Sequence, residues 1–499
     1  MEAIGLAAEL VLRWDVLATV LSAAVFGLFV GAIPGLTATM AIALLVPVTF
    51  FMEPIPAVGA MVTCAAMAIF AGDIPGTLLR IPGTPASAAY TNEAYAMTKR
   101  GEAETALGAN LLFSALGGLF GTAVLIVAAP YLAEVALRFS APEYFWMALL
   151  GLTCAAFIGA SSPIKGLVSL LIGLTVATVG LDNPAAVPRF TFGSVELLGG
   201  IDFIAAMIGL FAISEILRNA GSGMASLPVP QVSIGNPLRG WGTLIRTHWR
   251  QQLRGNGIGV GVGALPGAGA DLAAWIAYAV SRRFSRTPER YGTGHVEGIV
   301  AASSANNAAL GAAWVPALVF GIPGDTITAI VIGVLFIQGL NPGPTLFIFN
   351  PQNIYAVFLI FILANLLMIP LGYVAIKAGR QLLRVPRRVL MPVILAFCVV
   401  GAFATNNSAF NIGVMLAFGI LGFFMEDNDI PVAPCILGIV LGGMVEAHFI
   451  TTMIRSDGDL LAFFYRPIAA GLGVVTILIW LAPLIGWLRR RLAAAGSQG

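Results

Sequence analysis

Two carboxylates follow Pro-Gly turns closely in the second half of the chain. Asp325 comes directly after Ile322-Pro323-Gly324, and Asp271 lies shortly after Pro266-Gly267. A helix loses a hydrogen bond at Pro and gains backbone freedom at Gly, so both turns predict a helix break. A carboxylate beside unwound backbone, with carbonyl oxygens completing the shell, is typical of a Na⁺ or H⁺ site. Asp325 and Asp271 are therefore the predicted cation-coupling residues, with Asp325 the expected Na⁺ position.

Each of these turns has a partner in the first half. Gly31-Ala32-Ile33-Pro34-Gly35-Leu36-Thr37-Ala38 resembles Gly263-Ala264-Leu265-Pro266-Gly267-Ala268-Gly269-Ala270, and Ile81-Pro82-Gly83-Thr84 resembles Ile322-Pro323-Gly324-Asp325. The offset is 232 positions from Gly31 to Gly263 and 241 from Ile81 to Ile322. A slowly growing offset indicates an internal duplication with small insertions. Random recurrence in a chain with 58 Gly and 29 Pro is the alternative.

Helix ends at these turns would suit an anionic solute. A half-helix that begins there presents free backbone N–H groups and the positive end of its dipole, which bind carboxylates. Hydroxyls near the turns and the amides inside an apolar segment could add donors. The predicted substrate-binding residues are Gly35, Thr37, Pro82, Gly83, Thr84, Ser87, Gly267, Gly269, Asn306, Asn307, Pro323, Gly324, Thr326 and Thr328. Tight helix packing is the alternative for the small residues, and helix–helix hydrogen bonding for the amides.

The elements that hold these residues are predicted to be membrane helices. The chain has 499 residues, of which 58% are hydrophobic and 10% charged, and its mean hydropathy is +0.92. A soluble domain carries about 25% charge. The apolar runs are long and continuous, unlike the alternating strands of a membrane barrel. We expect an all-α polytopic membrane protein with about 12 transmembrane helices plus re-entrant or broken helices, arranged as two inverted-topology repeats.

Composition and basic residues divide the chain into four parts. Residues 1–218 form the predicted first membrane repeat, 219–256 a cytoplasmic linker, 257–455 the second repeat, and 456–499 a C-terminal transmembrane helix with a basic cytoplasmic tail. Basic clusters stand both before and after 257–280, and the positive-inside rule assigns both to the cytoplasm. We therefore predict that 257–280 enters the membrane, turns at Pro266-Gly267 and returns. A cluster that violates the charge rule is the alternative.

Other ionisable residues in apolar segments are weaker candidates. Asp73 and Arg80 flank the segment that leads into the turn at 81–84, and Lys165 could attract a dianionic solute. Placement at the membrane interface, or pairing for packing, is the alternative for each. Glu426-Asp427-Asn428-Asp429 is interpreted as a solvated acidic loop.

Several function classes lack the residues that they need. The chain has no Walker A sequence and no GxSxG, HExxH or CxxC motif, so no catalytic residues are predicted and the protein is not expected to be an enzyme. The four cysteines are scattered in apolar runs. No cofactor is predicted beyond Na⁺ or H⁺ as the coupling ion, and no nucleic acid is expected as a partner. No basic region precedes the first apolar run, so no cleaved signal peptide is expected.

The whole set of landmarks resembles one family. Over about residues 15–455 the chain is similar to the large membrane subunit of tripartite tricarboxylate transporters, the TctA type. The matching segments are Gly31-Ala32-Ile33-Pro34-Gly35-Leu36, Ala43-Leu44-Leu45-Val46-Pro47-Val48-Thr49-Phe50, Ile81-Pro82-Gly83-Thr84-Pro85, Gly263-Ala264-Leu265-Pro266-Gly267, Gly321-Ile322-Pro323-Gly324 and Gly339-Leu340-Asn341-Pro342-Gly343-Pro344.

The resemblance implies partners and an energy source. It implies a secondary transporter in which a periplasmic solute-binding protein delivers an organic carboxylate. It also implies a small four-helix membrane subunit and a Na⁺ or H⁺ gradient that drives uptake. Two segments depart from the family: Phe70-Ala71-Gly72-Asp73 stands where Tyr-Gly-Gly-Ser is common, and Glu93-Ala94-Tyr95-Ala96-Met97-Thr98 where Asp-Gly-Tyr-Pro-Met-Ala is common. A citrate specificity is therefore not carried over.

The leading hypothesis is a subunit that imports a di- or tricarboxylate by cation symport. The expected location is the lipid bilayer of the bacterial inner membrane, with many passes and a cytoplasmic C-terminus. The alternative is the permease of an ATP-driven importer. Glu102-Ala103-Glu104-Thr105-Ala106-Leu107-Gly108 resembles the loop that such a permease presents to its ATPase, but the apolar residue and Leu-Pro expected further on are absent.

Overall fold

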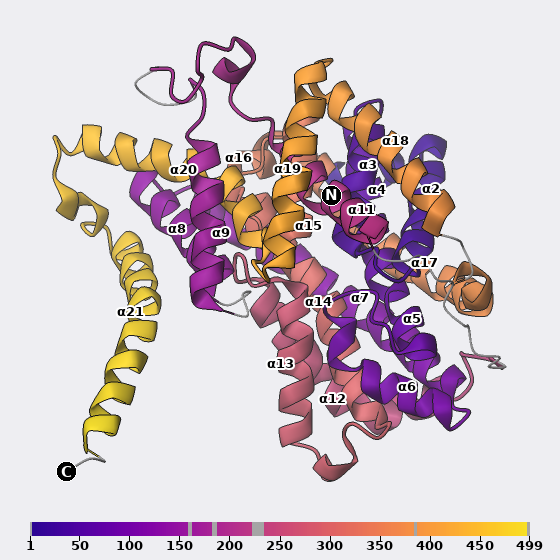
Figure 1. Cartoon of the computed structure of the whole chain (residues 1–499). Helices are drawn as coiled ribbons and strands as arrows, with labels where there is room; N and C mark the ends of the chain where they lie inside the picture. The colour runs from indigo at the N-terminus through magenta and orange to yellow at the C-terminus, as the bar shows by residue number, and fades with distance from the viewer. Residues whose placement is uncertain (1, 158–161, 182–186, 222–233, 384–386, 497–499) are drawn as a thin grey trace.

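The computed structural model is built from helices that follow one another with short connections (Figure 1). It describes residues 2–157, 162–181, 187–221, 234–383 and 387–496. Within these ranges the regular secondary structure is helical, apart from a single bridge between Gly180 and Arg189. This agrees with the predicted all-α polytopic class, since a helix satisfies its own backbone groups within a bilayer.

The first half contains both long apolar helices and short broken ones. They are α1 (Glu2–Leu12), α2 (Trp14–Gly31), α3 (Ala38–Thr49), α4 (Pro54–Ala71), α5 (Asp73–Leu79), η1 (Ser87–Ala89), α6 (Thr91–Lys99), α7 (Ala103–Ala136), α8 (Ala141–Phe157), α9 (Pro163–Ala177), η2 (Glu196–Gly199), α10 (Phe203–Ile208), the π-helical η3 (Gly209–Ile213) and α11 (Ser214–Gly221).

The second half repeats much of this order. It contains α12 (Trp241–Gly263), α13 (Gly269–Arg283), η4 (Pro288–Arg290), α14 (Val296–Phe320), α15 (Thr326–Ile337), α16 (Pro344–Phe349), α17 (Pro351–Leu382), α18 (Arg387–Asn406), α19 (Ala409–Asp427), α20 (Val432–Arg455), η5 (Leu460–Phe463) and α21 (Pro467–Gly496). In Figure 1 the α2–α3 pair lies toward the upper end of the molecule and the α12–α13 pair at the lower end. The two corresponding pairs therefore lie at opposite ends of the molecule in this view.

Glycines let the central helices approach closely. A Cβ atom at Gly31 of α2 would lie 2.4 Å from the carbonyl oxygen of Ala68 in α4. In the second half, a Cβ atom at Gly263 of α12 would lie 2.5 Å from the carbonyl oxygen of Ala309 in α14. The same offsets that relate the turns relate these contacts, 232 positions from Gly31 to Gly263 and 241 from Ala68 to Ala309. Equivalent contacts at these offsets are what the predicted duplication would produce.

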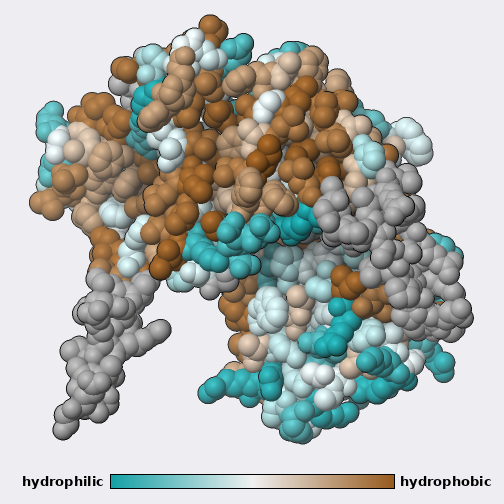
Figure 2. Space-filling model, viewed as in Figure 1, coloured by the Kyte–Doolittle hydropathy of each residue, from teal (hydrophilic) through white to brown (hydrophobic). Residues whose placement is uncertain are grey.

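The helices differ in how well they could cross a bilayer. Among the described residues, six helical stretches are long and apolar enough to span: Trp14–Gly31, Pro54–Leu79, Ala103–Ala136, Pro351–Gly379, Ala409–Asp427 and Val432–Arg455. Shorter apolar helices, including α3 and α15, accompany them. The number of about 12 spans stays a prediction. Figure 2 shows hydrophobic side chains over the upper part of this face and hydrophilic ones at the lower end.

The predicted re-entrant segment does turn back on itself. Helix α12 ends at Gly263, α13 begins at Gly269, and the two helices pack against each other. The first arm is longer than predicted, because α12 already begins at Trp241, inside the segment expected to be a linker. Part of that linker, 222–233, lies outside the described residues. At the other end of the chain, α21 packs against α8 and extends away from the main body (Figure 1).

Candidate functional site

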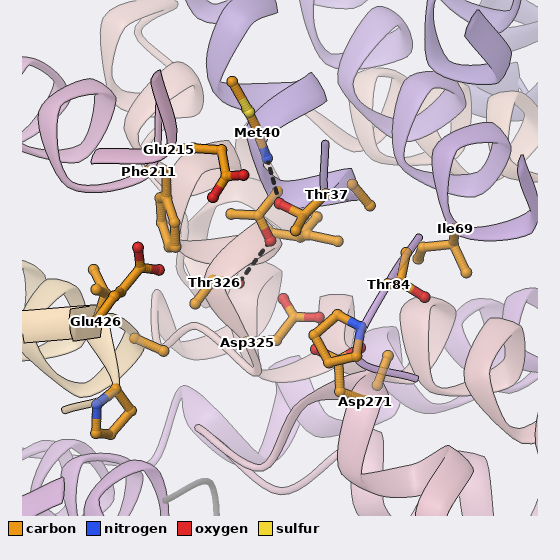
Figure 3. A pocket seen from close by; sticks show the side chains of 18 of the residues that line it. Thr37, Met40, Ile69, Thr84, Phe211, Glu215, Asp271, Asp325, Thr326 and Glu426 are labelled. Carbon is orange, nitrogen blue, oxygen red and sulfur yellow. Dashed lines mark hydrogen bonds between the residues drawn. The ribbon is translucent and has the colours of Figure 1, made fainter. Parts of the chain in front are cut away.

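A cavity lies where the broken helices meet (Figure 3). Its volume is about 270 Å³. The lining residues come from all four Pro-Gly regions and from α4, η3, α11, α14, α19 and the start of α20. They are Gly35, Thr37, Ala38, Thr39, Met40, Ile69, Thr84, Pro85, Phe211, Glu215, Ala270, Asp271, Asn306, Asp325, Thr326, Ile327, Glu426, Pro431, Val432 and Ala433.

The first turn ends α2 and begins α3. Gly35 has a φ of +90°, a left-handed conformation that glycine adopts without a steric penalty. Thr37 then caps α3, because its hydroxyl accepts a hydrogen bond from the Met40 backbone N–H at 3.2 Å. The sequence Pro-Gly-Leu-Thr therefore produces a helix N-terminus on the cavity wall.

The second turn is locked by two close contacts. The Gly83 N–H donates to the carbonyl oxygen of Gly72 at 3.1 Å, and a Cβ atom at Gly83 would lie 2.6 Å from the Gly72 Cα. Thr84 and Ser87 then bond each other reciprocally: the Thr84 N–H donates to Ser87 Oγ, and the Ser87 N–H donates to Thr84 Oγ1, both at 3.1 Å. Thr84 lines the cavity. Ser87 does not line it and stabilises the turn through its hydrogen bonds to Thr84.

The third turn places Asp271 at the start of α13. Gly267 has a φ of +77° and lies against the backbone of Gly151 in α8. Asp271 lies in the first turn of α13 and lines the cavity. Its Oδ1 atom accepts a hydrogen bond from the Ala86 backbone N–H at 3.0 Å, which joins the third turn to the second.

The fourth turn makes Asp325 the N-cap of α15. Asp325 Oδ1 accepts a hydrogen bond from the Thr328 N–H at 2.8 Å, while the Asp325 N–H donates to Thr328 Oγ1 at 2.9 Å. This reciprocal capping box satisfies two helix N–H groups that would otherwise lack partners. The next residue, Thr326, lies 3.1 Å from Thr39 of α3 between hydroxyl oxygens, which joins the fourth turn to the first (Figure 3).

The cavity is strongly acidic. Four carboxylates line it, and no lysine or arginine is among the described lining residues. They form two groups. Asp271 and Asp325 come from the second-half turns. Glu215 and Glu426 both contact Arg218, whose guanidinium bonds Glu426 and lies 3.6 Å from Glu215.

The structure brings seven of the predicted site residues to the cavity wall. They are Gly35, Thr37, Thr84, Asn306, Thr326, Asp271 and Asp325. The other predicted residues do not line the cavity. Asn307 lies within α14, and the rest belong to the turns or the helix starts beside them: Pro82, Gly83, Ser87, Gly267, Gly269, Pro323, Gly324 and Thr328. Gly324, for example, packs against the backbone of Ala313, and the Asn307 amide bonds back to Ser303 on its own helix at 3.4 Å.

Thr39, Phe211, Glu215 and Glu426 are among the cavity residues that sequence reasoning missed. The interpretation of 426–429 as a solvated loop is wrong for Glu426, because α19 continues to Asp427 and carries Glu426 to the cavity wall. The 232-position offset that links Gly31 to Gly263 also links Thr39 to Asp271, and could have identified Thr39. Phe211 lies in the π-helical turn η3, a feature common at functional sites.

Lys165 does not reach the cavity. Its ammonium group donates to the carbonyl oxygen of Asn428 at 2.8 Å and lies 3.6 Å from the Asp429 carboxylate. A pairing role therefore describes Lys165 better than attraction of a solute. In the described ranges, His, Cys, Asp and Glu side chains form no cluster of three or more that could hold a metal ion.

Taken with the apolar helices, a cavity enclosed by four helix breaks defines a multi-pass membrane protein of the transporter class. The sequence profile of the tripartite tricarboxylate transporter TctA family matches residues 17–437. The chain belongs to this family, as the sequence landmarks predicted. It is thus the large membrane subunit of a tripartite system.

Two relatives from Agrobacterium vitis are similar to this chain. One, described as an uncharacterized 52.8 kDa protein in the TAR-I ttuC' 3' region, is 34% identical over 466 residues, which is 92% of each chain. The other, described as an uncharacterized protein in the TAR-II ttuC' 3' region, is 35% identical over 227 residues, or 45% of this chain and 94% of the relative. No solved structure matches.

Proposed function

We propose that this subunit imports an organic di- or tricarboxylate across the bacterial inner membrane by symport with Na⁺ or H⁺. A periplasmic solute-binding protein would deliver the solute, and the small four-helix membrane subunit would complete the complex. The C-terminus would lie in the cytoplasm. The observation that carries the proposal is the meeting of all four Pro-Gly turns at one cavity.

The helix ends supply what an anion needs. Helices α3, α13 and α15 all begin at the cavity wall, and each presents the positive end of its dipole there. The hydroxyls of Thr37, Thr84 and Thr326 stand beside these ends as hydrogen-bond donors. Backbone N–H groups and hydroxyls can thus bind a carboxylate although no basic residue is among the described lining residues.

The acidic residues explain why binding of the anionic solute would be coupled to binding of a cation. A carboxylate solute beside ionised Asp271 and Asp325 would be repelled, because unit charges 4 Å apart interact by about 4 kcal/mol at an effective dielectric constant of about 20. A bound Na⁺ or proton removes this repulsion. Each ligand therefore raises the affinity for the other, and this reciprocal effect is what symport requires.

The test is uptake by the complete complex, with its binding protein, in proteoliposomes without ATP. Radiolabelled citrate and succinate serve as probes, and inward Na⁺ and H⁺ gradients are applied separately. We expect at least one of the two gradients to drive accumulation of a probe inside the vesicles. Asp325→Asn should abolish the increase in uptake rate that this gradient produces. Asp15→Asn, which changes an exposed carboxylate paired with Arg13, is the matched control.

Uptake that requires ATP and ignores both gradients would contradict symport and favour an ATP-driven permease. Ala103, Ala106 and Leu107, from the segment that resembles an ATPase-docking loop, are buried at the start of α7. This burial argues against such a loop at 102–108.

A further inference from the structure

Asp73 is a buried carboxylate that the cavity does not explain. It is the first residue of α5, directly after the break that ends α4, and its side chain is only 2% exposed. It is absent from the cavity lining and makes no side-chain hydrogen bond that caps its own helix. The duplication does not account for it either, because the residue 241 positions further on is Trp314.

The side chain of Asp73 has a hydroxyl partner and no cationic one. The Tyr90 hydroxyl donates to Asp73 Oδ1, and Tyr90 is itself 1% exposed. None of the ion pairs found among the described residues includes Asp73. A negative charge at this position would therefore be uncompensated, and an uncompensated charge inside a membrane protein costs several kcal/mol.

Four charged groups on the segments around α5 have other partners. On its C-terminal side, the Arg80 guanidinium bonds the Asn92 side chain at 3.1 Å. On α6, Lys99 stacks over the Tyr95 ring at 5.1 Å, and Glu93 accepts hydrogen bonds from the 292–295 backbone and from Tyr278. On α17, Lys377 bonds the carbonyl oxygen of Ile234 at 2.8 Å.

Tyr90 also links Asp73 to the cavity. The short segment 86–90 begins with Ala86, whose N–H bonds Asp271, and ends with Tyr90. We propose that Asp73 is a buried proton-binding site, held by Tyr90 and connected through the segment 86–90 to Asp271 on the cavity wall.

The surroundings of Asp73 favour the protonated, neutral form of its carboxyl group. One oxygen of Asp73 accepts from Tyr90 while the other carries the proton, so no charge is buried. The existence of this proton site does not depend on which solute is carried. Only its use in coupling rests on the proposed function, where a proton on Asp73 would respond to a cation or proton at Asp271.

Infrared spectroscopy of the complete complex in lipid tests the site without any transport measurement. The difference spectrum of wild type minus Asp73→Asn should contain the carbonyl band of a protonated carboxylic acid at neutral pH. Tyr90→Phe removes the hydrogen bond but keeps the carboxyl group, so its band should shift in frequency. Asp15→Asn should leave this spectral region unchanged.

A structural brace would give a different pattern. Asn at position 73 still accepts a hydrogen bond from Tyr90, so Asp73→Asn should fold, and Tyr90→Phe provides a second variant if it does not. Absence of the acid band in wild type, or a band that Tyr90→Phe leaves unshifted, would overturn the proposal. Failure of gradient-driven uptake would instead overturn the proposed function and leave the band in place.

Discussion

The two halves of the molecule have similar helix breaks but differ in the charge of the side chains at equivalent positions of these turns. Thr84 and Ser87 cap the second turn of the first half, and Asp325 and Thr328, each 241 positions later, cap the corresponding turn of the second half with the same reciprocal hydrogen bonds. The pattern recurs 232 positions apart at Thr39 and Asp271. The first half presents hydroxyls where the second presents carboxylates.

This difference suggests that the turns of the two halves have different roles at the cavity. Each half's first turn contacts the other half's second turn, through Thr39 and Thr326 on one side and through Asp271 and Ala86 on the other. Both halves therefore build the cavity jointly. Under the proposed function, the hydroxyls of the first-half turns can contact an anion without repulsion, whereas the carboxylates of the second-half turns can hold the cation that removes the repulsion of the anion.

The largest expected effect contrasts Asp271 with Thr39. Asp271→Asn should lower gradient-driven citrate uptake by up to about 100-fold, since coupling energies reach about 3 kcal/mol. Thr39→Ala removes one hydrogen bond worth about 1 kcal/mol and should lower uptake only a few-fold. Initial rates in proteoliposomes measure both. Equal losses in the two variants would contradict the division between the halves.

The next effect concerns packing, where the halves should behave alike. Gly31→Ala and Gly263→Ala each force a Cβ atom to within 2.5 Å of a facing carbonyl oxygen. Overpacking of this kind costs about 1–3 kcal/mol. Thermal unfolding of the detergent-solubilised protein should detect similar destabilisation. Gly261→Ala is the control, because no atom lies within 4 Å of its added Cβ. A stable Gly31→Ala variant beside an unstable Gly263→Ala variant would break the structural equivalence.

Smaller effects should follow loss of the caps. Ser87→Ala and Thr328→Ala each remove one partner of a reciprocal pair, so each should cost about 1 kcal/mol of stability. The conservative changes Ser87→Thr and Thr328→Ser keep the hydroxyl and should restore most of it. Thermal unfolding again provides the measurement. Sensitivity in one half alone would show that the two turns are held differently.

The smallest effect is expected at Lys165. Its pair with Asp429 is exposed, and exposed pairs contribute about 0–1 kcal/mol. Lys165→Ala should therefore leave both thermal stability and citrate uptake nearly unchanged. A large rise in the KM for citrate would revive the idea that Lys165 attracts the solute.

Local chemistry explains what the sequence could predict. Pro and Gly mark the four helix breaks, and the apolar runs between them mark membrane helices. The fold class and the convergence of the turns on one site could therefore be predicted. Glu426 was not, because four consecutive polar residues resemble a loop, and only tertiary packing shows that α19 continues to Asp427. Glu215 could not be predicted either, because it follows a π-helical turn, and such a turn has no clear sequence signal.

The linker illustrates a different limit. Residues 241–256 are polar and basic, which predicted a solvated connection, yet they form the first part of α12. Gly255 and Gly259 in this helix lie directly on the backbone of Ala301 and Ala305 in α14. Packing between glycines and a neighbouring helix thus overrides the average polarity of the segment, and only the three-dimensional partner makes that visible.

The most direct test uses whichever probe the wild type accumulates, citrate or succinate, and measures the cation dependence of its uptake by the Asp271→Asn/Asp325→Asn double variant of the complete complex. Wild-type uptake should accelerate steeply with an inward Na⁺ or H⁺ gradient. The double variant should not respond to either gradient but should still exchange internal for external probe, which would show that the cavity remains intact. Gradient-driven accumulation that survives both substitutions would contradict the assignment of the charge of the second half to coupling.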